Sequence, residues 1–200
     1  MKRNVLLVAA LLSGMAAPLA GQATGTPSFN APYRAFTRSE FGGTISFPSG
    51  ANYGLEGQYR FGYENFDIGA RGGLIDFGGG FTRAIIGVEA RGRVITHTEQ
   101  FPLDGAVVVG LGGSFGSGTS AALIVGGLSL GRRVDPKDSQ VSIVPYGEPT
   151  LFIASGGGST SLNFALGLGA DVRLSKVFDL RVSVGLGDIR GAAFSAVWVH

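Results

Sequence analysis

Apolar and polar side chains alternate along most of the chain after residue 50. Between residues 55 and 63, one parity carries Leu55, Gly57, Tyr59, Phe61 and Tyr63, and the other carries Glu56, Gln58, Arg60 and Gly62. The same two-residue period returns in residues 66–74, 83–94 and 162–186. A period of two is typical of β-strands that present one apolar and one polar face.

All such runs together predict about ten strands. They cover residues 38–47, 52–63, 66–76, 82–94, 102–114, 120–132, 140–154, 161–174, 178–187 and 192–199. Most of these strands reach the ~9 to 11 residues that a tilted strand needs to cross a membrane, against ~5 to 6 in soluble sheets. We predict an all-β fold, a closed antiparallel up-and-down transmembrane β-barrel. Because the run 120–132 alternates poorly, a barrel of eight strands is the alternative.

The side of the sheet that meets lipid follows from three features. The charge-bearing parity is rich in Gly, as a narrow lumen requires, and closure would protect the long strands from edge pairing. The apolar parity ends in aromatic residues at the predicted periplasmic rim, which is typical of an interfacial girdle: Phe41, Tyr63, Phe66, Phe101, Phe178 and Trp198. A secreted soluble β-sandwich that binds a ligand is the less favoured interpretation.

The N-terminus has the composition of an export signal. Lys2 and Arg3 precede an apolar run too short to span a bilayer, and small residues follow it. We predict a cleaved signal peptide in residues 1–23, an N-terminal periplasmic segment in 24–37 and the outer-membrane barrel domain in 38–200. Cleavage lowers 16 basic residues to 14 against 14 acidic ones, so the formal net charge falls from +2 to 0. No nucleic-acid partner is indicated.

The strand parity sends charged side chains of both signs into the lumen. We predict a lumen charge network, because unpaired charges would be costly in a confined interior. Its members are Glu56, Arg60, Asp67, Arg71, Glu89, Arg91, Glu148, Asp171, Arg173, Asp179 and Arg181. The same parity also sends Glu64, Asp104, Arg83, Arg93 and Arg133 inward.

Pro145 and Pro149 share one parity of the strand 140–154. In an antiparallel ladder alternate residues bond to the same neighbour, so two missing N–H donors four residues apart thin one seam. A bulge or bend explains such prolines in ordinary strands. The alternative is a lateral seam that passes a small hydrophobic molecule from the lumen to the outer leaflet.

Several segments resemble a known family. The signal peptide, the runs 57–63 and 66–73 and the aromatic final strand 194–200 are similar to the small outer-membrane barrels of the OmpA, OmpX and OmpW type. The resemblance implies an outer-membrane location and recognition of the C-terminal strand by the assembly machinery. This chain departs from the family in that Val199 and His200 follow Trp198, and in its short external loops.

Catalytic chemistry is not indicated. His97 lies in a predicted periplasmic turn and His200 ends the chain, so no catalytic triad can form on the external rim. We expect no enzyme activity, no cofactor and no metal, and a monomer that contacts outer-membrane lipid. The predicted function is a structural role in the Gram-negative envelope; the alternative is a passive, porin-like conduit for small or hydrophobic solutes.

Overall fold

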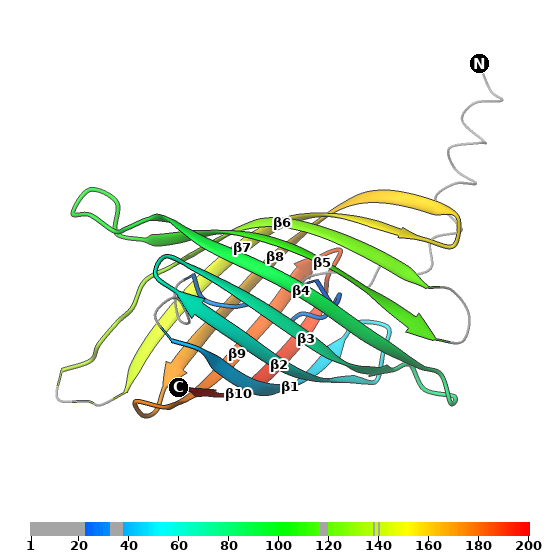
Figure 1. Ribbon diagram of the computed structural model, residues 1–200, viewed down its shortest axis with the longest axis horizontal. Coiled ribbons are helices and arrows are strands. Elements are labelled where there is room, and N and C mark those ends of the chain that lie inside the picture. The colour runs from blue at the N-terminus through cyan, green and yellow to red at the C-terminus, as the bar shows by residue number, and fades with distance from the viewer. Residues whose placement is uncertain (1–22, 33–37, 117–119, 138, 140) are drawn as a thin grey trace, which may run out of the picture.

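The computed structural model describes residues 23–32, 38–116, 120–137, 139 and 141–200. The described residues form ten strands (Figure 1). They are β1 (Glu40–Pro48), β2 (Tyr53–Tyr63), β3 (Phe66–Asp76), β4 (Thr82–Ile95), β5 (Asp104–Gly116), β6 (Ala121–Gly131), β7 (Ser142–Gly156), β8 (Ser159–Arg173), β9 (Phe178–Gly187) and β10 (Gly191–Val199). The signal peptide prediction lies outside the described residues except for Ala23.

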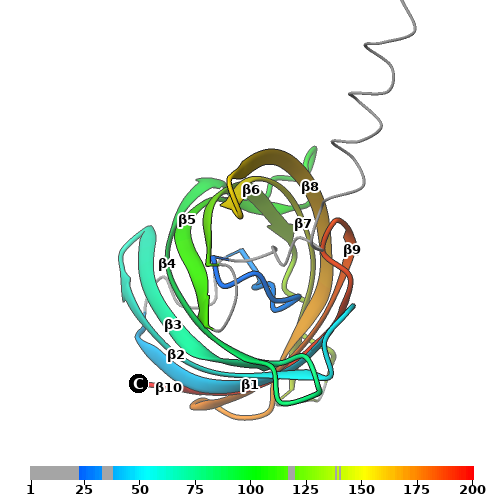
Figure 2. The ribbon, with the colours of Figure 1, turned by 90° about the vertical axis from the view of Figure 1, so that its right-hand side faces the viewer.

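Each strand pairs antiparallel with the next along the chain, and β1 pairs with β10 to close the barrel (Figure 2). The predicted fold class is therefore confirmed, with ten strands. The eight-strand alternative and the soluble β-sandwich are wrong, because all ten runs enter one closed sheet. The described part of the chain contains no helix long and apolar enough to cross a membrane.

The two faces of the sheet are inverted relative to a soluble barrel. In β2, Leu55 is 51% exposed while its neighbour Glu56 is 6% exposed, and this alternation continues along the strand. The large outward side chains of the strands are apolar or aromatic, drawn from Val, Leu, Ile, Phe, Tyr and Trp, and most of the buried Arg, Asp and Glu side chains point inward. An apolar exterior around a charged interior is the pattern of an outer-membrane β-barrel.

Aromatic side chains gather at the rim where β1 begins and β10 ends. The Phe41 and Trp198 rings stack with their centroids 5.7 Å apart, and the Phe178 ring lies 5.0 Å from Trp198. The Tyr63 and Phe66 rings lie 5.6 Å apart. Such a cluster suits the boundary between lipid and water, where aromatic rings are enriched.

The last residue continues the closing ladder beyond Trp198. The backbone N–H of His200 donates to Ser39 O at 2.9 Å, and the N–H of Ser39 donates to His200 O at 3.1 Å. The imidazole ring lies 6.1 Å from the Phe41 ring and 6.0 Å from the Tyr59 ring. The C-terminal His200 is therefore part of the rim in place of a terminal aromatic residue.

Two charges predicted for the lumen lie elsewhere. Glu64 is exposed in the turn between β2 and β3, with a left-handed φ of 50°. The Arg133 side chain is 46% exposed and pairs with Asp135 beyond the end of β6. Both predictions extended the strand parity into turns, where alternation no longer fixes the direction of a side chain.

Candidate functional site

The lumen contains a continuous chain of ion pairs near the rim where β1 begins. Its centre is Arg60 on β2, whose guanidinium donates to Asp67 on β3 and, at 2.6 Å, to Glu89 on β4. Asp67 also accepts from Arg91 Nη2 at 2.8 Å and from Arg91 Nε at 3.1 Å. Arg60 and Arg91 thus donate to the same carboxylate from two different strands, because a planar guanidinium can donate several hydrogen bonds at once.

The chain continues across the closing strands through Glu40. Arg181 on β9 donates to both carboxylate oxygens of Glu40, at 2.9 and 2.6 Å, and its Nε lies 3.1 Å from Asp171 on β8. Arg60 Nε lies 3.8 Å from the same Glu40. Glu40 therefore joins the two halves of the network across β10, which separates β9 from β1.

Ten of the eleven predicted network residues are buried. The exception is Arg173, whose side chain is 27% exposed at 4.0 Å from Asp179. Glu56 and Arg71 lie 4.0 Å apart, separate from the main chain of pairs. Glu148 is also separate: no described arginine lies within ion-pairing distance, and its Oε2 has no hydrogen-bond partner among the described residues.

Glu40 was missed by the sequence analysis although its signal was present. The inward parity of β1 is Glu40, Gly42, Thr44 and Ser46, opposite the exposed Phe41, Ile45 and Phe47. Glu40 is the first residue of the strand, so no alternating residues precede it to indicate its direction. Extending the parity from Thr44 back to residue 40 is enough to place it in the lumen.

The N-terminal segment, defined as residues 23–32, occupies the lumen. We expected residues 24–37 in the periplasm, but all described residues among them, 24–32, are buried inside the barrel (Figure 2). Thr24 and Thr26 donate to the two carboxylate oxygens of Glu56, at 2.8 and 2.6 Å. The prediction for residues 24–32 was wrong because their placement depends on the shape of the lumen and not on any periodicity of their own.

The barrel wall carries glycine where the N-terminal segment approaches it. A Cβ atom added to Gly167 would lie 2.3 Å from the Phe29 ring, and one added to Gly112 would lie 1.8 Å from Ala23 O. Both distances are far below van der Waals contact. These glycines of the inward parity therefore form the hollow that receives the segment.

The two prolines of β7 face outward and lie next to a gap in the ladder. β7 keeps its register with β6, but Leu128 and Ser129 of β6 have no register partner in β7. Pro145 O accepts from Arg132 N at 3.3 Å, so the position of the missing Pro145 donor also faces β6. Pro149, four residues on, faces the same strand, and both missing donors therefore fall on the β6–β7 seam.

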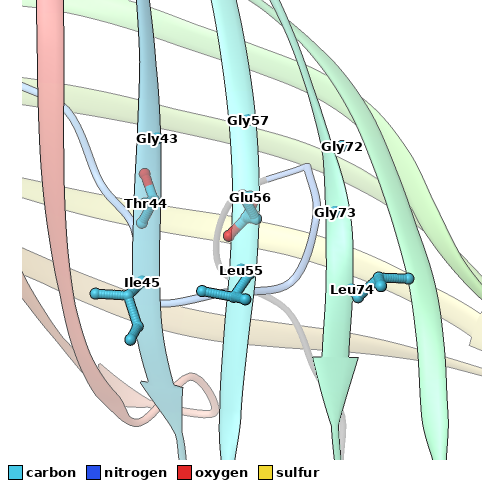
Figure 3. A pocket seen from close by; sticks show the side chains of 9 residues that line it. All are labelled: Gly43, Thr44, Ile45, Leu55, Glu56, Gly57, Gly72, Gly73 and Leu74. Atoms are coloured by element: carbon cyan, nitrogen blue, oxygen red, sulfur yellow. The ribbon is translucent and has the colours of Figure 1, made fainter.

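A shallow groove of about 490 Å³ lies on the outward face of β1, β2 and β3 (Figure 3). Ile45, Leu55 and Leu74 lie in a row on these strands, beside glycines of the same parity. The groove is therefore a depression in the apolar belt.

The described titratable residues at the rim include one Asp–His contact. His97 Nδ1 lies 2.9 Å from Asp104 Oδ2, and the backbone N–H of His97 donates to Asp104 Oδ1 at 3.1 Å. The His97 side chain is half-exposed. This pair fixes the connection that precedes β5.

Comparisons with known proteins concern the fold alone. No protein-family model matches the chain, and no curated protein matches it either. Among solved structures it is similar to the β-domain of the Bordetella autotransporter BrkA, with 14% identity over 82% of this chain and 97% of that one and a TM-score of 0.46. It is also similar to a de novo designed transmembrane β-barrel (12% identity, 84% and 98% coverage, TM-score 0.38) and to the KdgM porin (9%, 80% and 98%, 0.37).

Proposed function

We propose that this chain is a closed outer-membrane barrel with a structural role in the cell envelope. The observation that carries the proposal is the burial of residues 23–32 inside the barrel, on top of a paired charge network. We expect a lumen occupied by buried side chains and by a segment of its own chain to obstruct an aqueous path through the barrel. Arginine and carboxylate side chains that pair with each other also offer no ring of one sign to select an ion.

Electrical recording in a planar bilayer tests this proposal. We expect purified full-length protein to insert without steady conductance steps. A variant that lacks residues 23–32 is the matched control, because it keeps all ten strands and loses only the segment. Steady single-channel steps from the full-length protein would contradict the structural role.

The second candidate function is a lateral conduit for small hydrophobic solutes. The observation in its favour is the gap opposite Leu128 and Ser129 on the seam that Pro145 and Pro149 interrupt. Replacing both prolines with Thr supplies two ladder donors. If the seam is the path, vesicles that contain the folded double variant take up a hydrophobic fluorophore more slowly than vesicles that contain the wild-type protein. Unchanged uptake would refute the conduit.

We also propose the cellular setting that the sequence indicates. The chain is exported, loses its signal peptide and resides in the outer membrane as a monomer without catalytic function, its last strand being read by the assembly machinery. Relationship to the OmpA, OmpX and OmpW barrels stays a prediction. Membrane fractionation and N-terminal sequencing of the mature protein test export and cleavage together.

A further inference from the structure

Five consecutive carbonyl groups of the N-terminal segment each accept a hydrogen bond from the barrel wall. The pairs are Ser183 Oγ to Pro27 O (2.7 Å), Arg71 Nη1 to Ser28 O (3.1 Å), Tyr146 Oη to Phe29 O (2.7 Å), Ser129 Oγ to Asn30 O (2.9 Å) and Arg91 Nη1 to Ala31 O (2.6 Å). The donors come from β9, β3, β7, β6 and β4, so they surround the segment. Contacts to successive carbonyls recognise a peptide backbone whatever its side chains are.

One side chain of the segment, that of Phe29, is buried in the barrel wall. Phe29 is 1% exposed and packs within an apolar cluster of the wall that includes Val125, Val144 and Phe152. The bare backbone of Gly167 lies against the face of the ring. The lumen thus combines a polar track for the backbone with an apolar pocket for one aromatic residue.

The segment is bound to the wall without being part of the sheet. Among the described residues, no hydrogen bond joins the backbone of residues 23–32 to the backbone of a strand; the segment is held by side chains of the wall. The ladder closes from β1 to β10 without them. Departure of the segment therefore breaks no strand pairing, and it uncovers donors such as Arg71, Arg91 and Tyr146 that are arranged for a peptide.

We propose that the lumen is a peptide-binding site and that residues 23–32 are its resident ligand. The class of ligand is a short peptide whose successive main-chain carbonyls accept hydrogen bonds from the wall and which carries an aromatic residue at the position of Phe29. This inference goes beyond the structural role, because it gives the closed interior a recognition function in which a second peptide of the same kind competes with the resident one.

The experiment weakens the resident segment in the full chain and offers a free peptide. The host is the Phe29→Ala variant, which keeps every wall residue. The probe is a fluorescent synthetic peptide of residues 23–32, ATGTPSFNAP, and the matched probe carries Ala in place of its Phe. We expect the Kd of the first probe to be at least about tenfold lower for the variant than for the wild-type protein. We also expect the variant to bind the first probe with a Kd at least about tenfold lower than that of the Ala probe.

A reversible tether controls for binding elsewhere. The chain has no cysteine, and a Cβ on Gly110 would lie 3.2 Å from Ala23 Cβ, close to the ~3.5 Å lower end of the disulfide range. Adding Ala23→Cys and Gly110→Cys to the Phe29→Ala host, refolded from the uncleaved chain so that position 23 is retained, holds the segment in place when oxidised. We expect oxidation to abolish binding of the probe and reduction to restore it.

Three results would overturn the proposal: no saturable binding to the reduced host, equal binding of the two probes, or binding that oxidation leaves unchanged. If Phe29→Ala does not fold, Thr24→Ala with Thr26→Ala replaces it, because this pair removes two hydrogen bonds to Glu56 and little packing. A barrel that stays electrically silent and binds no probe retains the structural role and loses the peptide site.

Discussion

The β1–β10 seam and the β6–β7 seam show how differently one barrel joins its strands. The first pairs every residue of Glu40–Pro48 with a partner in Gly191–Val199. The second omits Leu128 and Ser129. The first and last strands meet at the first seam with no turn between them, whereas β6 and β7 are joined by residues 132–141. A seam that lacks a covalent connection needs a complete ladder, and a connected seam tolerates a gap.

Side chains strengthen the same contrast. Inside the barrel, Arg181 reaches across β10 to Glu40, and outside it Trp198 stacks on Phe41. At the β6–β7 seam the inward Glu148 has no ion pair among the described residues, and the outward positions hold prolines. The closing seam is therefore secured by an ion pair inside and an aromatic stack outside, whereas the inner face of the β6–β7 seam relies on apolar packing of residues such as Val125 and Phe152.

The largest expected effect is the loss of Glu40. Glu40→Gln leaves Arg181 and Arg60 with fewer carboxylates in a buried site, so we expect a loss of about 3 to 5 kcal/mol in the free energy of unfolding. Glu148→Gln is the matched control, and its loss should stay below about 1 kcal/mol because no buried ion pair is broken. Urea unfolding in lipid vesicles measures the free energy of unfolding of both variants. Equal losses would mean that the ion pairs of Glu40 do not make the closing seam more stable than the β6–β7 seam.

Arginine on the outward face should damage both seams to the same extent. Phe194→Arg on β10 and Leu151→Arg on β7 place a charge against lipid, with an expected cost of about 2 to 4 kcal/mol near the midplane. The same unfolding assay applies. A much smaller cost at Leu151 would mean that the outer face of the β6–β7 seam meets water and not lipid.

The aromatic stack contributes less than the ion pair. Trp198→Ala removes the ring that contacts both Phe41 and Phe178, and we expect the lost stacking alone to cost about 0.5 to 1.5 kcal/mol. Trp198→Phe is the conservative control and should recover most of it. If Trp198→Ala and Trp198→Phe unfold at the same urea concentration, the stack does not secure the seam.

The smallest expected effect is a gain at the weaker seam. Pro145→Thr with Pro149→Thr adds two N–H donors toward β6, each contributing about 0.5 to 1.5 kcal/mol where a ladder bond forms. Each substitution also gives up the ~0.4 to 1 kcal/mol by which a proline restricts the unfolded chain, so we expect a net gain of about 0.5 kcal/mol for the pair. Hydrogen exchange of the amides of residues 127–131 in detergent should slow. Unchanged exchange would show that the gap has another cause than the missing donors.

The sequence predicted the strands well because lipid and lumen impose opposite demands on alternate residues. The predicted ranges 66–76 and 178–187 coincide with β3 and β9. The inward placement of Arg60, Asp67 and Arg91 followed from the same parity. Where the chain leaves the sheet, as at Glu64 and Arg133, parity no longer applies and the prediction fails.

The position of the N-terminal segment could not be predicted in this way. Residues 23–32 contain Thr, Pro, Ser and Asn with no period, and such a composition is equally typical of a solvated linker. What places them is the fit to donors on five strands and to glycines such as Gly167. That information is spread over the whole chain and becomes visible only when the barrel is closed.

The location of the segment also fixes an order of events. Pro27 accepts its hydrogen bond from Ser183, 156 positions later in the chain. The complete set of donors exists only after β9 has joined the sheet, so a segment that precedes every strand in the sequence is among the last to settle. Arrival of the segment in the lumen therefore marks the end of assembly, and a fluorophore attached within residues 24–32 would time that final step directly.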